Sequence, residues 1–226
     1  KALVEGTESS GTLKESLSKR WNVPSITVVG GAGDNAAGAI GSGVTDSGQA
    51  MLSLGTSGVI FAVTDDFVYS PELALHSFCH ALPNKWHAMS VHLSAASCLQ
   101  WFANIAANGD VAPLLNELNG SSNLPSKSTC FFIPYLSGER TPHNDPSLTG
   151  RFCNLTHNTS RSDMTYAVLE GVAFAFKDGL NIMQDAGVNL HSISVIGGGA
   201  RSQYWRQLIS DVLGLEIAYR LGGEVG

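Results

Sequence analysis

Short apolar runs separated by glycine-rich or polar breaks predict a chain that mixes strands and helices. Mostly apolar residues occupy 49–54 and 58–63, and Gly55-Thr56-Ser57 between them predicts a tight hairpin. A second hairpin is predicted from strands 75–82 and 86–92 around Pro83-Asn84. Further strands are predicted at 26–29, which reads as buried, and at 131–133, 191–196 and 216–220.

Helical spacing of apolar residues, together with start and stop signals, predicts the remaining elements. Ser162 is a candidate N-cap for a long helix that Gly187 would end, and Gly214 would end the last helix. The predicted helices span 12–20, 35–42, 94–107, 162–186 and 202–213. Hairpins combined with strand–helix alternation predict an α/β fold with a mixed sheet flanked by helices.

Composition narrows the class of protein. The 226 residues carry a net charge of −6, and no basic stripe is present, so we expect neither a nucleic-acid partner nor an anionic membrane surface. No apolar run approaches the roughly 18 residues of a transmembrane helix. The four cysteines lie far apart, which indicates reduced thiols and a cytoplasmic location. Neither end resembles a natural terminus, so we expect a piece of a longer polypeptide.

The glycine-rich segment 30–36 contains the first candidate for chemistry. Asp34 stands after a predicted strand and at the start of a predicted helix, where it could act as a general base or merely cap the helix. Gly31, Gly33 and Ala36 also match the spacing of a dinucleotide-binding fingerprint, which leaves an NAD site as an alternative. Against that alternative, the Asp34 carboxylate would repel a pyrophosphate in this turn.

Two further glycine segments follow predicted strands. Glycine and hydroxyl residues at 55–58 could expose backbone N–H groups to phosphate oxygens, or could simply form a hairpin turn. The run 197–202 could approach a flat base or ribose, or could be a close packing corner between a strand and a helix.

Other polar or aromatic residues have structural explanations. The spacing of His76, Cys79 and His80 fits no zinc pattern, so we predict no metal site. Arg140 could meet a phosphate, although a loop ion pair with Glu139 or another carboxylate explains it more simply. The tryptophans Trp101 and Trp205 lie on amphipathic helices and are predicted to be core residues rather than stacking platforms.

Taken in order, the three glycine segments resemble the C-terminal lobe of the FGGY carbohydrate kinases over essentially the whole chain. The family's second signature is similar to residues 150–170, with Asn154 standing where the family has glycine. Longer stretches resemble the family members that act on the pentulose D-xylulose. These stretches are His76-Ser-Phe-Cys-His80, Leu93-Ser-Ala-Ala-Ser97, 135–144 and 199–206.

The resemblance implies an actin-like, ribonuclease-H-like lobe spanning 1–226, with the N-terminal sugar-binding lobe and a short C-terminal portion missing. It implies transfer of a phosphoryl group from ATP, with Mg²⁺, to the 5-hydroxyl of D-xylulose or a related sugar. Asp34 would be the catalytic base, and a homodimer is possible. The implied ATP-binding residues are Gly55, Thr56, Ser57, Ala96, Gln100, Gly198, Gly199 and Ser202. Without the other lobe, we expect this piece to have little or no kinase activity.

Overall fold

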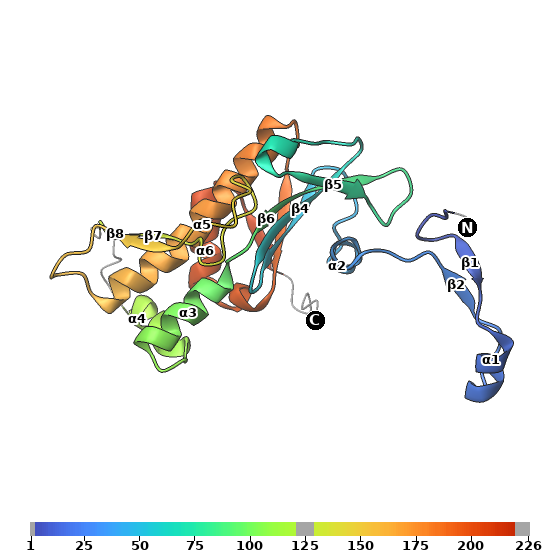
Figure 1. The fold of residues 1–226 in the computed structure, drawn as a ribbon, viewed down its shortest axis with the longest axis horizontal. Helices are drawn as coiled ribbons and strands as arrows, with labels where there is room; N and C mark the ends of the chain where they lie inside the picture. Colours follow the sequence, from blue (N-terminus) through green and yellow to red (C-terminus); the bar gives the residue numbers. More distant parts are fainter. Residues whose placement is uncertain (1–2, 121–128, 220–226) are drawn as a thin grey trace.

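A six-stranded mixed sheet forms the centre of the molecule in a computed structural model, which describes residues 3–120 and 129–219 (Figure 1). The strand order is β10-β9-β3-β4-β6-β5. Strands β3, β4, β6 and β5 are joined as antiparallel neighbours, whereas β9 pairs in parallel with both β3 and β10. The predicted α/β class with a mixed sheet is therefore confirmed. The strands are β3 (Gln49–Leu54), β4 (Gly58–Thr64), β5 (His76–Cys79), β6 (Trp86–His92), β9 (Ser192–Ile196) and β10 (Ile217–Tyr219).

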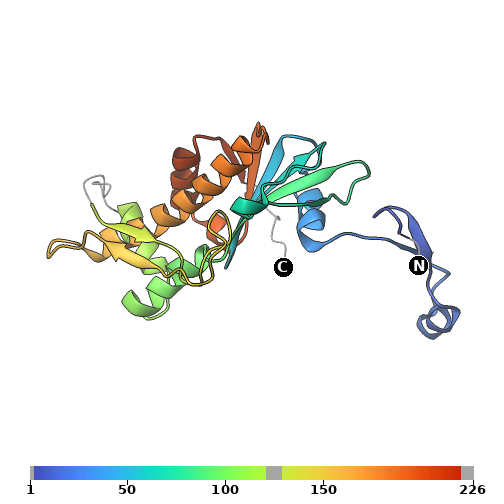
Figure 2. The same cartoon turned by 45° about the horizontal axis from the view of Figure 1, so that its top comes forward.

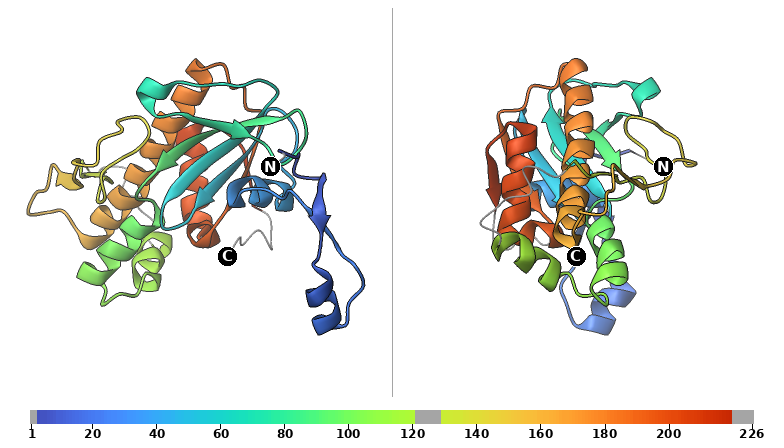
Figure 3. Two further views of the ribbon diagram at one scale, coloured as in Figure 1. Left: turned by 45° about the vertical axis from the view of Figure 1, so that its right-hand side comes forward. Right: turned by 90° about the vertical axis from the view of Figure 1, so that its left-hand side faces the viewer.

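Helices cover both faces of this sheet (Figures 2 and 3). Successive side chains of a strand point to opposite faces, so the sheet contributes to two cores. On β3, Leu52 and Leu54 belong to the larger core beneath most of the helices, whereas Met51 belongs to a smaller core beneath α2. The helices on the larger core are α3 (Ala96–Ala106), α4 (Ala112–Gly120), α5 (Arg161–Asp185) and α6 (Gln203–Leu213), and α2 is Asp34–Gly41. Two short 3-10 helices, η1 (Pro71–Leu73) and η2 (Gly198–Arg201), lie in connections.

Residues 3–33 form an N-terminal arm that projects from the sheet (Figure 1). It contains β1 (Ser9–Thr12), α1 (Glu15–Trp21) and β2 (Thr27–Val29), and β1 and β2 form a separate two-stranded antiparallel sheet. The prediction of a buried strand at 26–29 is wrong about burial, because all of β2 is exposed. The predicted helix at 12–20 starts later than expected, since residues 9–12 are used as a strand.

The long helix α5 begins with a capping box, in which Ser160 Oγ accepts the Asp163 N–H and the Asp163 carboxylate accepts the Ser160 N–H. The predicted cap, Ser162, is therefore wrong by two residues, because Asp163 reaches back only to Ser160. The preceding loop also contains a short ribbon of β7 (Phe131–Ile133) and β8 (Arg151–Cys153). The predicted polar loop at 119–129 falls largely on 121–128, which lie outside the described residues.

Candidate functional site: a cavity at the ends of β3 and β9

A cavity of about 790 Å³ lies where β3 ends and the segment after β9 begins. Its size falls within the range of about 300–1,000 Å³ typical of small-molecule sites. Three segments that are distant in sequence contribute to it: the 55–57 turn, the start of α3, and residues 198–202. Seven of the eight residues that the family resemblance implies for ATP line this cavity: Gly55, Thr56, Ala96, Gln100, Gly198, Gly199 and Ser202. The eighth, Ser57, is not among its lining residues.

Parallel pairing of β3 with β9 brings two of these segments together, because parallel strands end at the same edge of a sheet. Gly197 has a φ of 94°, and a Cβ there would lie 2.8 Å from the carbonyl carbon of Leu54. A Cβ on Gly199 would lie 2.6 Å from Leu54 Cγ. Both glycines therefore permit close packing against β3. A Cβ on Gly198, by contrast, would meet no atom within 4 Å, so the backbone here faces open space.

The 55–57 turn is held by the start of α3. The N–H groups of Ala95 and Ser97 donate to the Thr56 carbonyl at 3.0 and 3.3 Å, and the Ala96 N–H donates to the Gly55 carbonyl at 2.8 Å. A trans peptide unit places its N–H opposite its carbonyl. The N–H groups of Thr56 and Ser57 consequently point away from α3, and within the described residues neither donates a hydrogen bond. This turn can present two backbone donors to an anion.

Aromatic side chains form part of the cavity wall. Trp205 is fully buried, and its Nε1–H donates to the Leu169 carbonyl at 3.1 Å. Trp101 is half-buried and stacks against Phe132. The predicted core position is confirmed for Trp205, whereas Trp101 is only partly buried and packs against the core; both tryptophans line the cavity. The lining residues not predicted are Ser97, Leu99, Trp101, Asn104, Val111, Leu115, Arg201 and Trp205.

Two of the predicted cavity residues also have roles within the protein. Ser202 is the N-cap of α6, and its Oγ accepts the Trp205 N–H at 3.2 Å. The Gln100 Nε2 donates to Asn104 Oδ1 at 3.2 Å and to the Gly109 carbonyl at 2.8 Å. The amide nitrogen of Gln100 is thus engaged in closing the turn after α3, which leaves its Oε1 to meet a ligand.

Asp34 lies apart from the cavity, on the helix that covers the opposite face of the sheet. It is the first residue of α2, and Gly33 is the N-cap without a side-chain hydrogen bond. The exposed Asp34 carboxylate accepts the N–H of Asn35 at 2.8 Å. Asp34 therefore does not cap the helix in the usual sense, and its carboxylate remains open to solvent.

The structure corrects the setting expected for the segment 30–36. Its preceding strand, β2, pairs with β1 and takes no part in the six-stranded sheet. A dinucleotide fingerprint requires a strand–turn–helix unit within a parallel sheet. The alternative NAD site at Gly31–Ala36 therefore lacks its structural context, and the argument that Asp34 follows a strand of an open sheet is also wrong.

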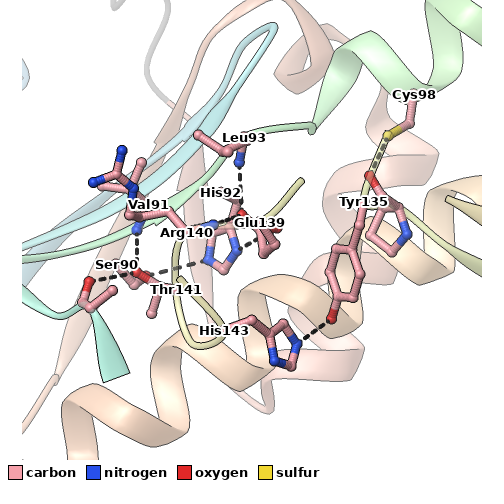
Figure 4. A network of polar contacts seen from close by, with 12 residues as sticks. Ser90, Val91, His92, Leu93, Cys98, Tyr135, Glu139, Arg140, Thr141 and His143 are labelled. Atoms are coloured by element: carbon pink, nitrogen blue, oxygen red, sulfur yellow. Dashed lines mark hydrogen bonds and ion pairs between the residues drawn. The ribbon is translucent and has the colours of Figure 1, made fainter. Parts of the chain in front are cut away.

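A second polar region lies in the loop between β7 and β8 (Figure 4). The expected ion pair between Glu139 and Arg140 is absent from the described residues, because Glu139 is buried and faces His92 Nδ1 at 3.6 Å. Nearby, burial raises the pKa of the Cys98 thiol to about 12, with a further contribution from the Glu139 charge. Cys98 is thus an unreactive thiol, and its Sγ contacts the Pro134 carbonyl at 3.5 Å.

On the α2 face, the rings of Phe61, His80 and His87 pack together. Burial, followed by the influence of His80, lowers the pKa of His87 to about 4. Within residues 3–120 and 129–219, no three His, Cys, Asp or Glu side chains converge as metal ligands would. None of the four cysteines, all of which lie in the part of the chain that the structure describes, forms a disulfide. Among the described helices, none is both long and apolar enough to span a membrane.

The chain is similar in sequence and in fold to several known proteins. The chain is 50% identical to the xylulose kinase of Escherichia coli K12 over 225 residues, and 49% identical to that of Klebsiella pneumoniae. These matches cover 100% of the chain but 46% of each relative, so the chain spans about half their length. A crystal structure of a xyloylose kinase from Brucella ovis superposes with a TM-score of 0.92 at 48% identity, covering 99% of this chain and 46% of that one.

The fold is that of the actin-like ATPases, as in these structural neighbours. A family model described as the C-terminal domain of the FGGY family of carbohydrate kinases matches residues 50–220, which cover the six-stranded sheet apart from Gln49, the first residue of β3. The match begins after the N-terminal arm and after α2. On this evidence, the chain belongs to the FGGY family of carbohydrate kinases.

Proposed function

We propose that this chain forms the C-terminal, nucleotide-binding lobe of an ATP-dependent kinase that phosphorylates the 5-hydroxyl of D-xylulose. The observation that carries the proposal is the convergence of the 55–57 turn, the start of α3 and residues 198–202 on one cavity. The choice of D-xylulose rests on the xylulose kinases to which the whole chain is about 50% identical.

Different parts of the cavity would bind different parts of ATP. The N–H group of Thr56, which lines the cavity, and that of the adjacent Ser57, which does not, would bind phosphate oxygens, and the two hydroxyls could add hydrogen bonds. The bare backbone at Gly198 would let the adenosine lie close to the chain, between it and the apolar wall near Trp101. Gly199 and Ser202 would border the nucleotide, with Ala96 and Gln100 opposite. Mg²⁺ would arrive on the ATP phosphates and neutralise their charge.

In the proposed reaction, the sugar hydroxyl oxygen forms a bond to the γ-phosphorus while the bond from that phosphorus to the bridging oxygen breaks. ADP leaves, and Asp34 accepts the proton of the attacking hydroxyl. The exposed carboxylate of Asp34 supports this role, because among residues 3–120 and 129–219 it accepts hydrogen bonds only from Asn35. Since Asp34 lies outside the cavity, the sugar would have to bridge the space between them, held by the lobe that the curated relatives possess beyond this chain.

The proposal also covers the cellular location and the oligomeric state of the full-length enzyme. We propose that the enzyme acts in the cytoplasm, where ATP is available, and that a homodimer is its assembled state. The isolated 226-residue chain would have little kinase activity, because the sugar contacts would come mainly from the other lobe.

The test uses the full-length polypeptide and measures ADP formation with ATP and D-xylulose. Asp34→Asn is expected to lower kcat by ~10²–10⁴-fold, as loss of a general base does. The matched control is Asp66→Asn, which changes another exposed carboxylate and should leave kcat within about twofold. An Asp34→Asn enzyme with kcat within about tenfold of the parent would contradict the role of Asp34, and absence of activity in the parent would contradict the function.

A further inference from the structure

Glu139 is a buried carboxylate that lies in the loop between β7 and β8, outside the cavity. Its side chain is fully buried, and one oxygen, Oε1, accepts the N–H groups of Leu93 at 2.9 Å and Arg140 at 2.7 Å (Figure 4). The other oxygen, Oε2, faces His92 Nδ1 at 3.6 Å. A carboxylate is costly to bury, so its presence here calls for a reason beyond filling space.

Attachment of the loop to the sheet does not require Glu139. Thr141, two residues further on, already pairs with β6: its N–H donates to the Val91 carbonyl at 3.0 Å, and its Oγ1 accepts the Val91 N–H at 3.0 Å. Thr141 Oγ1 also donates to the Ala74 carbonyl at 2.9 Å. Glu139 extends this attachment past the end of β6 to Leu93, which belongs to the connection into α3.

That connection is the segment that orients the 55–57 turn. Only one residue separates Leu93 from Ala95, whose N–H, with those of Ala96 and Ser97, donates to the Gly55 and Thr56 carbonyls. Because these carbonyls are fixed, the planar peptide units fix the opposite N–H groups of Thr56 and Ser57. A continuous series of hydrogen bonds and short backbone links therefore runs from the Glu139 carboxylate to the Thr56 and Ser57 N–H groups, and Thr56 lines the cavity.

We propose that Glu139 is a positioning residue for ATP, which holds the 93–97 segment so that the 55–57 turn presents its N–H groups to the phosphates. The inference rests on the proposed function. It distinguishes Glu139 from Thr141, since both belong to the same loop, but Thr141 bonds to Val91 within β6 and Glu139 bonds to Leu93 in the segment that holds the turn.

Three variants of the full-length protein test this, with ATP affinity measured by calorimetry and KM measured for both substrates. Glu139→Ala is expected to weaken ATP binding by about tenfold and to leave the KM for D-xylulose within about twofold. Glu139→Gln keeps an oxygen that can accept both N–H groups and should restore ATP affinity to within about threefold of the parent. Thr141→Val is the matched control, which should lower the melting temperature as Glu139→Ala does while leaving ATP affinity within about twofold.

Equal losses of ATP affinity in Glu139→Ala and Thr141→Val would overturn the proposal, as would unchanged ATP affinity in Glu139→Ala. If Glu139→Ala does not fold, Glu139→Asp serves instead, because its shorter side chain cannot reach the Leu93 and Arg140 N–H groups together; it should then weaken ATP binding more than Glu139→Gln does. Calorimetry separates this test from that of the proposed function. If the parent protein binds ATP but does not phosphorylate D-xylulose, the proposed substrate is wrong, and the effect of Glu139 on ATP binding can still be measured.

Discussion

Apolar residues are mostly buried in the six-stranded sheet and mostly exposed in the N-terminal arm. In the sheet, strands such as β4 are buried on both faces by helices, and Trp205 behind them is fully buried. In the arm, every residue of β1 and β2 is exposed, and Trp21 of α1 retains 57% of its accessible surface. A sheet needs a second layer to bury its apolar face, and the arm has none within the described residues. The two regions should therefore differ sharply in how much they stabilise the chain.

The largest expected effect compares two tryptophans. Trp205→Ala should lower the free energy of unfolding by about 3–5 kcal/mol, because it opens a large cavity in the core and removes the hydrogen bond to Leu169. Trp21→Ala makes the same chemical change in the exposed arm and should cost less than about 1 kcal/mol. Urea denaturation of both variants measures this. Similar losses of unfolding free energy in the two variants would show that the arm unfolds together with the sheet, and would contradict the expected difference between the two regions.

The second prediction concerns acid sensitivity of the sheet. The pKa of His87 is about 4 in the folded chain, against an ordinary value of 6.5, so the unfolded chain binds more protons between these values. The free energy of unfolding should consequently fall as pH decreases from about 6.5 to 4, by up to about 3 kcal/mol from this group. His87→Gln should flatten the dependence over that window, as followed by denaturation at several pH values. His157→Gln, at an exposed position, is the control and should leave the parent's slope in place.

The third prediction compares a glycine that packs against β3, Gly199, with one that faces open space at the cavity, Gly198. Gly199→Ala should cost about 1–3 kcal/mol of folding free energy, because its Cβ would overlap Leu54. Gly198→Ala has open space and should change stability by less than about 0.5 kcal/mol, while weakening ATP binding if the nucleotide approaches this backbone. Thermal unfolding and calorimetry with ATP distinguish these effects. A Gly198→Ala protein with unchanged ATP affinity would place the nucleotide elsewhere in the cavity.

The smallest expected effect compares helix starts. Ser160→Ala should cost about 1 kcal/mol by removing the capping box of α5, whereas Ser162→Ala should cost less than about 0.5 kcal/mol. In the arm, α1 begins after Lys14 with no side-chain cap, so Lys14→Ser offers a gain instead of a loss. Urea denaturation of each variant measures these changes. A larger loss at Ser162 than at Ser160 would contradict the assignment of the cap.

Local patterns predicted the sheet better than the arm, for physical reasons. The β3–β4 hairpin was predictable because two apolar runs flank a glycine turn. The end of α6 was predictable because glycine favours the left-handed conformation, which Gly214 adopts with a φ of 71°. Residues 9–12 have no apolar alternation, so nothing in their pattern indicated a strand, and their pairing with β2 depends on residues 15 to 20 positions away. The two serines near the start of α5 both fit an N-cap, and only the reach of Asp163 decides between them.

The candidate site was predictable in its parts and not in its assembly. Glycine after a strand indicated the 55–57 turn and the 197–202 run separately, but their contact follows from the pairing of β3 with β9. The sequence spacing does not reveal which strands become neighbours. The bond from Glu139 to Leu93 spans 46 residues, and the local sequence favoured a pair with Arg140 instead. Burial of the carboxylate, which only the fold determines, sets the actual partner.

The contact between Leu54 and residues 197–199 has a consequence for synthesis of the protein. The 55–57 turn leaves the ribosome more than 140 residues before residues 198–202, and β3 has no parallel neighbour until β9 emerges. Such long-range pairing is slow to form. A nascent chain that ends before β9 should therefore fail to retain nucleotide, while one released after α6 should retain it. ATP-agarose capture of stalled chains would thus mark the moment at which this lobe closes its central sheet.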